Sequence, residues 1–77
     1  MRVQVRCYSG YKGPERPISF SIGNRDLEID EVMDRWYGPD YLYFRVLAQD
    51  GNLYILKFNE REDFWELEFF KKNTGNS

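Results

Sequence analysis

The dipeptide Asp50–Gly51 separates two segments, 41–48 and 52–58, that are rich in aromatic and branched aliphatic residues. Asp-Gly between such segments is a strong signal for a two-residue β-hairpin turn. Because a two-residue turn fixes the register, it also fixes which side chains share a face. Both faces of the hairpin 41–58 are then largely apolar. Either a small sheet curls around its own core, or one face contacts another molecule.

The two-residue turn predicts that Ala48 lies opposite Leu53 and that Val46 lies opposite Ile55. We assign one face to the interior, namely Phe44, Val46, Ala48, Leu53 and Ile55. The other face is the candidate binding surface, which comprises Tyr43, Arg45, Leu47, Tyr54, Leu56 and Phe58. Tyrosines around an arginine are typical of protein interfaces. The register does not say which face is inner, and other segments of the chain could cover the outer one.

Strict alternation of apolar and polar residues predicts further strands on both sides of this hairpin. The segments 2–8 and 18–22 alternate, and a loop with Gly and Pro breakers separates them. Gly23–Asn24 offers a second hairpin turn. The segment 64–70 alternates again and follows a polar turn. The chain therefore contains about six short strands in sequence order.

The segment 26–38 fits two structures. As a strand it alternates apolar and acidic residues, provided that a bulge near Asp30–Glu31 moves Val32 onto the inner face. We favour the bulged strand because β-branched and aromatic residues suit strands and a hairpin signal precedes it. As a short helix near 30–37 it has apolar residues at i, i+3, i+4 and i+7, namely Ile29, Val32, Met33 and Trp36.

The predicted fold class is mainly β: one small domain at 1–70, an antiparallel meander of five to six strands that forms a curled sheet or an SH3-like barrel. An α+β domain with one short helix near 30–37 is the alternative. Residues 71–77 contain no core residue, and we expect a flexible C-terminal tail. Large rings let a short chain fill a core, and the core candidates are Phe20, Trp36, Phe44, Trp65 and Phe69.

Charges on the first and last predicted strands indicate how the sheet could close. Arg2 and Arg6 face outward on the first strand, and Glu66 and Glu68 face outward on the last. If these strands are neighbours, opposite charges lie across from one another and close the sheet into a barrel.

The sequence lacks most of the residues on which enzymes and metal sites depend. It has no histidine and a single cysteine, Cys7, which we place on a strand as a small buried apolar residue. Asp26, Glu28 and Asp30 would share one strand face, where we expect a solvated surface rather than a cation site. No phosphate-binding loop is present. We therefore predict no enzyme activity, no metal and no cofactor.

Charge is unevenly distributed along the chain. Residues 1–25 hold five basic residues against one acid, a net charge of +4, and residues 26–77 hold six against twelve, a net charge of −6. Pairing between these two parts within the folded chain is the simplest expectation. The net charge of −2 argues against nucleic acid, because a domain that binds it is usually basic.

No apolar run approaches the ~18 residues that a membrane span needs. The N-terminal residues alternate and do not form the apolar core of a secretory signal. The single cysteine excludes an internal disulfide framework. We therefore expect a bacterial-type cytoplasmic protein without a membrane partner.

The stretch Arg16–Phe69 resembles a family of short uncharacterised bacterial proteins. The residues that carry the resemblance are RPISF, DRWYGPD, YFRV, DGNLYIL and WEL, and DRWYGPD is the most specific of them. The family has no known activity, so the resemblance implies no catalytic residue. It implies a compact, mostly β domain.

These observations favour a small non-catalytic binding domain. Its expected partner is another protein or a second copy of itself, bound through the aromatic hairpin 41–58. Two alternatives belong to other classes: a module that binds single-stranded nucleic acid by stacking bases on aromatic rings, and a purely structural accessory domain.

Overall fold

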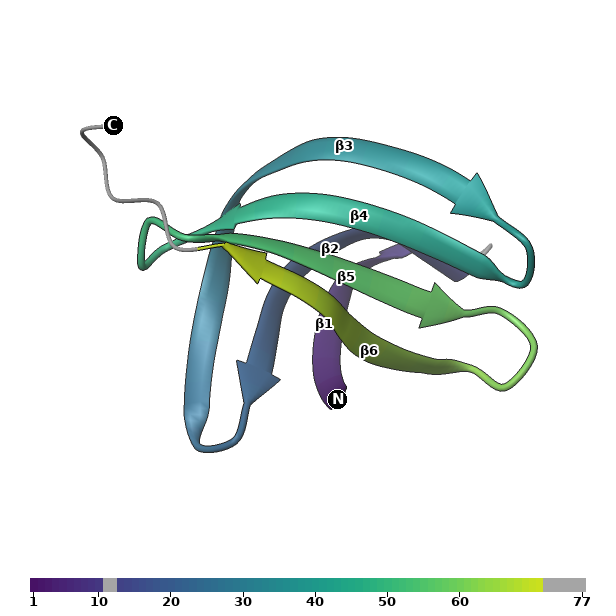
Figure 1. Cartoon of the computed structure of the whole chain (residues 1–77), viewed down its shortest axis with the longest axis horizontal. Helices are drawn as coiled ribbons and strands as arrows, with labels where there is room; N and C mark the ends of the chain where they lie inside the picture. The colour runs from purple at the N-terminus through teal and green to yellow at the C-terminus, as the bar shows by residue number, and fades with distance from the viewer. Residues whose placement is uncertain (11–12, 72–77) are drawn as a thin grey trace.

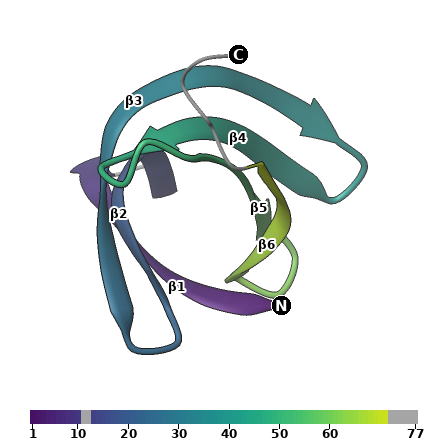
Figure 2. The same cartoon turned by 60° about the vertical axis from the view of Figure 1, so that its left-hand side comes forward.

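The computed structural model describes residues 1–10 and 13–71, in which all regular structure is β (Figure 1). Six antiparallel strands follow one another around a closed barrel, which Figure 2 shows in a view toward its interior. The mainly β barrel predicted from the sequence is therefore confirmed. The strands are β1 (Arg2–Gly10), β2 (Gly13–Ile22), β3 (Arg25–Gly38), β4 (Tyr41–Ala48), β5 (Leu53–Asn59) and β6 (Phe64–Lys71).

Strand β3 is the longest, and it changes partner along its length. Its first part pairs with β2 and its remainder with β4, so the alternative of a helix near 30–37 is wrong. The ladder with β4 shifts register at Asp30, where the bulge was predicted, and Val32 packs against the core as expected. A second shift occurs at Met33 and was not predicted.

The second bulge decides where Trp36 points. With one bulge, the period of two would turn Trp36 to the same side as Val32, toward the core. The extra residue at Met33 reverses the alternation, so that Arg35 pairs with buried Phe44 and Trp36 is displaced to the outer face. The prediction that Trp36 belongs to the core is therefore wrong.

The β4–β5 hairpin has a three-residue turn, not the predicted two-residue turn. Ala48 N donates to Asn52 O at 3.0 Å, and Gly51 N donates to Ala48 O at 2.9 Å. Gly51 has φ +83°, in the left-handed region that such a turn needs at its last position. The Asp50 carboxylate holds the turn by accepting hydrogen bonds from Asn52 N at 3.0 Å and Tyr54 Oη at 2.7 Å.

The longer turn shifts β5 by one residue and inverts its faces. Val46 lies opposite Tyr54 and Phe44 lies opposite Leu56. The placement of Leu53 and Ile55 in the interior is therefore wrong, whereas that of the β4 residues Phe44, Val46 and Ala48 is confirmed. The buried apolar cluster consists of Val3, Phe20, Leu27, Leu42, Phe44, Val46, Ala48, Tyr54, Leu56, Phe58 and Trp65.

A short seam between β1 and β6 closes the barrel. Arg2 lies opposite Glu66, Val3 lies opposite Trp65, and Leu67 N donates to the carbonyl of Met1 at 2.8 Å. The first and last strands are therefore neighbours, which is the condition under which the sequence indicated closure of the sheet. The expected pairing of Arg2 and Arg6 with Glu66 and Glu68 is not the one formed. The Arg2 guanidinium lies 4.0 Å from the Phe64 ring centroid, and Lys57 of β5 forms ion pairs with the two β6 carboxylates.

The expected C-terminal tail begins where β6 ends. Lys71 is the last residue of β6 and lies opposite Leu53. The rest of the tail, 72–77, lies outside the described residues. The backbone of Phe69, a predicted core residue, pairs with that of Ile55. The Phe69 side chain is not among the parts that the structure describes, so its placement in the core stays a prediction.

Two neighbouring residues of β5 test the register. Leu56 is 0% exposed, whereas Ile55 is half-buried on the outer face. We expect Leu56→Ala to lower the free energy of unfolding by about 2–5 kcal/mol and Ile55→Ala by about 1 kcal/mol or less. Urea unfolding followed by tryptophan fluorescence measures both. A larger loss of unfolding free energy for Ile55→Ala than for Leu56→Ala would mean that Ile55 is the buried residue, as a two-residue turn requires.

The Asp50 network makes stability depend on pH. Burial acts to raise the pKa of Asp50, but hydrogen bonds from Tyr54 and Asn52, together with the Arg25 guanidinium, lower the pKa below its ordinary value. A carboxyl of this kind stabilises the fold above its unfolded-state pKa of about 3.9, and the contribution is lost as pH falls through the lower folded-state pKa. We expect Asp50→Asn to be less stable near neutral pH and to show a flatter acid dependence in urea unfolding. Parallel pH curves for the two proteins would contradict this.

Candidate functional site

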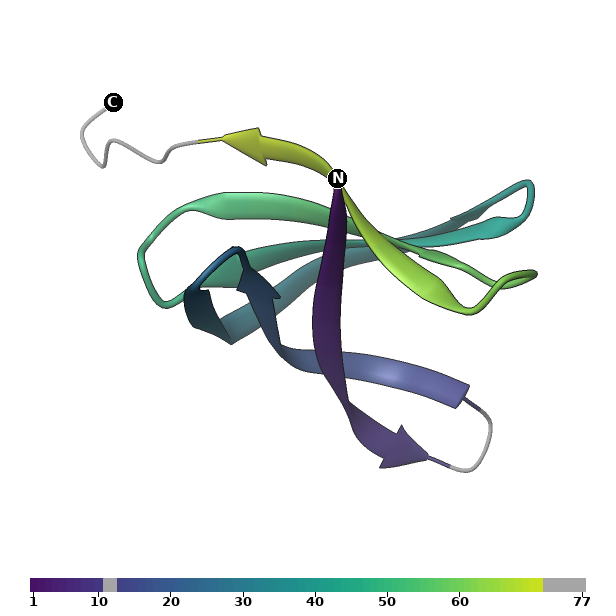
Figure 3. The ribbon, with the colours of Figure 1, turned by 90° about the horizontal axis from the view of Figure 1, so that it is seen from below.

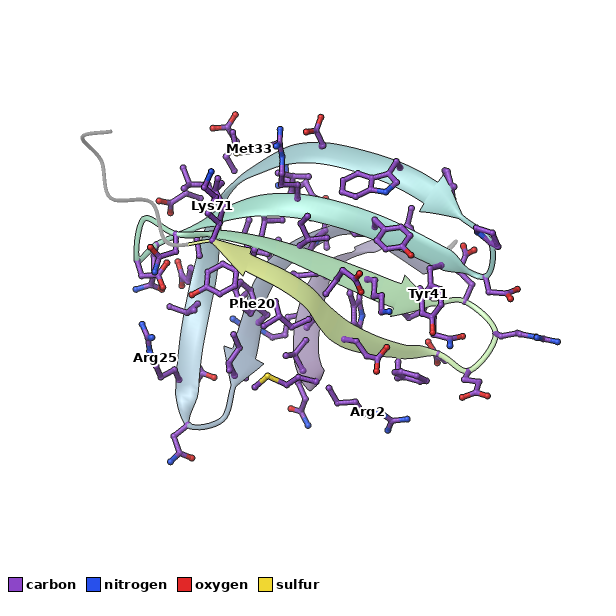
Figure 4. The ribbon with its side chains drawn as sticks, viewed as in Figure 1. Arg2, Phe20, Arg25, Met33, Tyr41 and Lys71 are labelled. Carbon is purple, nitrogen blue, oxygen red and sulfur yellow. The ribbon has the colours of Figure 1, made fainter. Side chains whose placement is uncertain are left out.

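One row of cross-strand neighbours runs over the outside of β3, β4, β5 and β6. Trp36 pairs with Tyr43, Tyr43 with Lys57, and Lys57 with Glu66. Figure 4 labels Tyr41 and Lys71 toward opposite ends of this sheet. The outer β3–β6 face comprises Glu31, Asp34, Trp36, Tyr41, Tyr43, Arg45, Leu47, Leu53, Ile55, Lys57, Glu66, Glu68 and Lys71.

Trp36 and Tyr43 form an aromatic platform on this face. Their ring planes are parallel to within 1°, and the centroids lie 5.3 Å apart. If the planes are separated by van der Waals contact at ~3.5 Å, the rings are displaced sideways by about 4 Å, so each leaves part of its face uncovered. Trp36 is 39% exposed. The platform therefore presents aromatic surface to solvent.

Gly38 sets the position of the Tyr43 ring. Gly38 lies two residues after Trp36, on the same side of β3. A Cβ at Gly38 would lie 2.9 Å from Cε1 of Tyr43, closer than side chains approach. The Tyr43 ring thus rests over the bare backbone of Gly38 and beside Trp36. The Tyr41 ring lies next to it, with centroids 6.1 Å apart and planes inclined by 46°.

Two cations of the outer β3–β6 face, Lys57 opposite Tyr43 and Arg45 two residues after it, already have carboxylate partners. Lys57 Nζ lies 3.0 Å from Glu68 and 3.7 Å from Glu66, and 4.5 Å from the Tyr41 ring centroid. The hydrogen bond to Glu68 raises the pKa of Lys57; burial opposes it, and the charges of Glu68, Tyr41 and Glu66 add to it. Arg45 forms an ion pair with Asp34 on β3. Neither side chain is therefore available to hold a phosphate without first releasing a carboxylate.

Apolar side chains extend this face toward the β4–β5 turn. Leu47 and Leu53 lie directly opposite each other and are half-buried. Ile55 is half-buried beside Arg45. The Arg45–Asp34 ion pair separates these aliphatic residues from the platform, so apolar and charged groups alternate along the face.

The structure divides the predicted binding residues into two groups. Tyr43, Arg45 and Leu47 lie on the outer β3–β6 face, as predicted. The one-residue shift of β5 places the other three in the core, namely Tyr54, Leu56 and Phe58. The sequence prediction missed Trp36, Tyr41, Lys57, Leu53 and Ile55. A three-residue turn with Gly51 in last position was the signal that could have identified the β5 members.

The acidic residues of the start of β3 and the Cys7 thiol do not gather into one site in the described part of the chain. Asp26, Glu28 and Asp30 are exposed, and no group of three or more metal-ligating residues occurs within 1–10 and 13–71. Burial raises the pKa of the Cys7 thiol, which packs against the core. This supports a structural role for Cys7, because reactive thiols have lowered pKa values.

A broad groove of ≈ 1260 Å³ lies between β1, β2, the start of β3 and the start of β6. It is larger than the ~300–1,000 Å³ of an ordinary ligand pocket. Arg2, Arg6, Asp26 and Glu28 are among its lining residues, and all four are exposed. Charged groups so accessible to water do not form an enclosed reaction site.

Comparison of the chain with protein-family models, with curated proteins and with solved structures found no match. The resemblance to a family of bacterial proteins stays a prediction. Among the described residues there is no helix of the length and apolarity needed to cross a membrane.

The substitution Gly38→Ala tests how the platform is held. The new methyl group would displace the end of the Tyr43 side chain, which can move without disturbing the backbone. We expect the nuclear Overhauser contacts between the Trp36 and Tyr43 rings to weaken, with a change in unfolding free energy below about 1 kcal/mol. Unchanged ring contacts would mean that Tyr43 does not lie over Gly38.

Proposed function

We propose that this protein is a small non-catalytic interaction domain that binds a partner protein through the outer β3–β6 face. The observation that carries the proposal is the exposed, parallel pair of Trp36 and Tyr43. Exposed large aromatics are costly in water and are the residues most often responsible for binding energy at interfaces. No described segment covers these strands from outside (Figure 1).

The chemistry of the chain supports a binding role over catalysis. The sequence has no histidine to act as acid or base near neutral pH. The carboxylates beside the platform form ion pairs, and Cys7 is half-buried with a raised pKa. The single cysteine also fits a reducing setting such as the bacterial cytoplasm.

Single-stranded nucleic acid is the second candidate partner, because bases stack on aromatic platforms. The charges disfavour it. Four carboxylates and three cations occupy the outer β3–β6 face, and Lys57 and Arg45 both bind carboxylates. Phosphate binding depends on cations that are free to neutralise it. A protein surface, which needs no such neutralisation, suits this face better.

Site-specific photo-crosslinking in the source cells tests the proposal. A benzophenone amino acid replaces Glu31, which is exposed at the edge of the face, and Glu60 in the β5–β6 turn serves as the off-face position. We expect a discrete protein adduct from position 31 only. We expect Trp36→Ala to remove it, since loss of a central aromatic residue commonly costs ~2 kcal/mol or more of binding free energy.

Tyr37→Ala is the matched control. Tyr37 neighbours Trp36 on β3, is 64% exposed, and lies on the opposite face of the strand. The adduct should survive this substitution. An adduct that persists with Trp36→Ala in a folded protein, or that disappears equally with Tyr37→Ala, would refute the proposal. An adduct that nuclease removes would establish nucleic acid as the partner.

A further inference from the structure

Three arginines on the outside of β1 and β2 have no carboxylate partner among the described residues. Arg2, Arg6 and Arg16 are all exposed, and the ion pairs of the described chain involve other cations. Arg6 donates to Ser19 Oγ at 2.8 Å, and Arg2 lies over Phe64. We call these three residues the basic face.

The expected internal pairing of the two oppositely charged parts of the chain is limited. In the described residues, one ion pair joins residues 1–25 to residues 26–77, between Arg25 and Asp50 at 3.7 Å. The three arginines of the basic face therefore have no ion-pair partner in the described chain, although the exposed carboxylates of Asp26 and Glu28 line the same groove as Arg2 and Arg6. The excess of acids in residues 26–77 includes Glu31, which has no ion-pair partner in the described chain.

The two charged faces point in opposite directions. In the closed order of six strands, β4 and β5 lie three positions from β1 and β2, on the other side of the barrel. Figure 2 shows β1 across the barrel from β4, and Figure 3 shows the β1–β2 hairpin projecting away from β5 and β6. A contact between the two faces must therefore join different molecules.

Neither ring of the Trp36–Tyr43 platform has a cation–π contact with a lysine or arginine of the described chain. Elsewhere, Arg2 covers Phe64 at 4.0 Å, Lys57 covers Tyr41 at 4.5 Å and Arg35 lies 5.8 Å from the Tyr37 ring centroid. Tryptophan is the ring that attracts a guanidinium most strongly. The Trp36–Tyr43 platform shares its face with Glu31, an exposed carboxylate without an ion-pair partner in the described chain, and therefore suits an arginine from another molecule.

We infer that the protein associates with itself head to tail, the basic face of one copy binding the outer β3–β6 face of the next. The inference rests on the proposed function and names the partner as a second copy. The contact joins two different surfaces, so it generates chains or rings of copies rather than a two-fold dimer. It depends on exposed charges, so salt weakens it.

Sedimentation equilibrium over a concentration series tests the inference with two complementary variants. Trp36→Ala disables the platform, and the double variant Arg6→Gln/Arg16→Glu disables the basic face. The amide introduced by Arg6→Gln retains a donor for Ser19. We expect the wild type to exceed monomer mass in dilute salt and to return toward monomer when salt is raised. Each variant alone should associate roughly tenfold or more weakly, and Tyr37→Ala should behave as wild type.

An equimolar mixture of the two variants gives the decisive result. Trp36→Ala retains the basic face, and Arg6→Gln/Arg16→Glu retains the platform. Head-to-tail association therefore predicts one-to-one dimers of the two variants that grow no further. A wild type that is monomeric at every concentration overturns the inference, as does a mixture that stays monomeric while the wild type associates. If the wild type is monomeric but the photo-adduct still depends on Trp36, the proposed function stands and the partner is a different protein.

Discussion

The Asp50 carboxylate holds the turn on which the arrangement of both hairpin faces depends. It binds Asn52 and the Tyr54 hydroxyl, and this geometry fits a three-residue turn that ends at Gly51. Tyr54 is 3% exposed, so its hydroxyl needs a hydrogen-bond partner within the fold, and half-buried Asp50 accepts that hydrogen bond. With Tyr54 inside, the period of two places Leu56 and Phe58 inside as well. Lys57 is consequently outside, where it meets Tyr43.

The sequence was sufficient to predict the class of fold and a meander of five to six strands, and it offered a closed barrel as one form of that meander. It failed at two positions for one reason. A single extra residue, in the β4–β5 turn and again at Met33 of β3, reverses the alternation of everything that follows. Asp-Gly is compatible with turns of two or three residues, and Met33 carries no local signal of a bulge. Trp36 and Tyr54 exchanged their predicted environments for this reason.

The candidate site depends on the same two shifts. The bulge at Met33 brings Trp36 to the outer face, and Gly38 leaves room for the Tyr43 ring beside it. Tyr43, Arg45 and Leu47 were predictable because β4 has an unbroken alternation. The contribution of Trp36 was not predictable, because the second bulge in β3 reverses its alternation and leaves no signal in the sequence. A barrel of six short strands uses one face of each strand for the core, and the rings that exceed the needs of that core remain on its surface.

The most direct test of this account is the solvent accessibility of individual aromatic rings. An uncharged gadolinium chelate broadens the NMR signals of ring protons that solvent reaches, and the protein is measured dilute and in moderate salt so that contact between copies does not shield a ring. The account predicts strong broadening for Trp36 and Tyr43 and little for Tyr54. Stronger broadening of Tyr54 than of Tyr43 would contradict it, because the hairpin would then bury the opposite face.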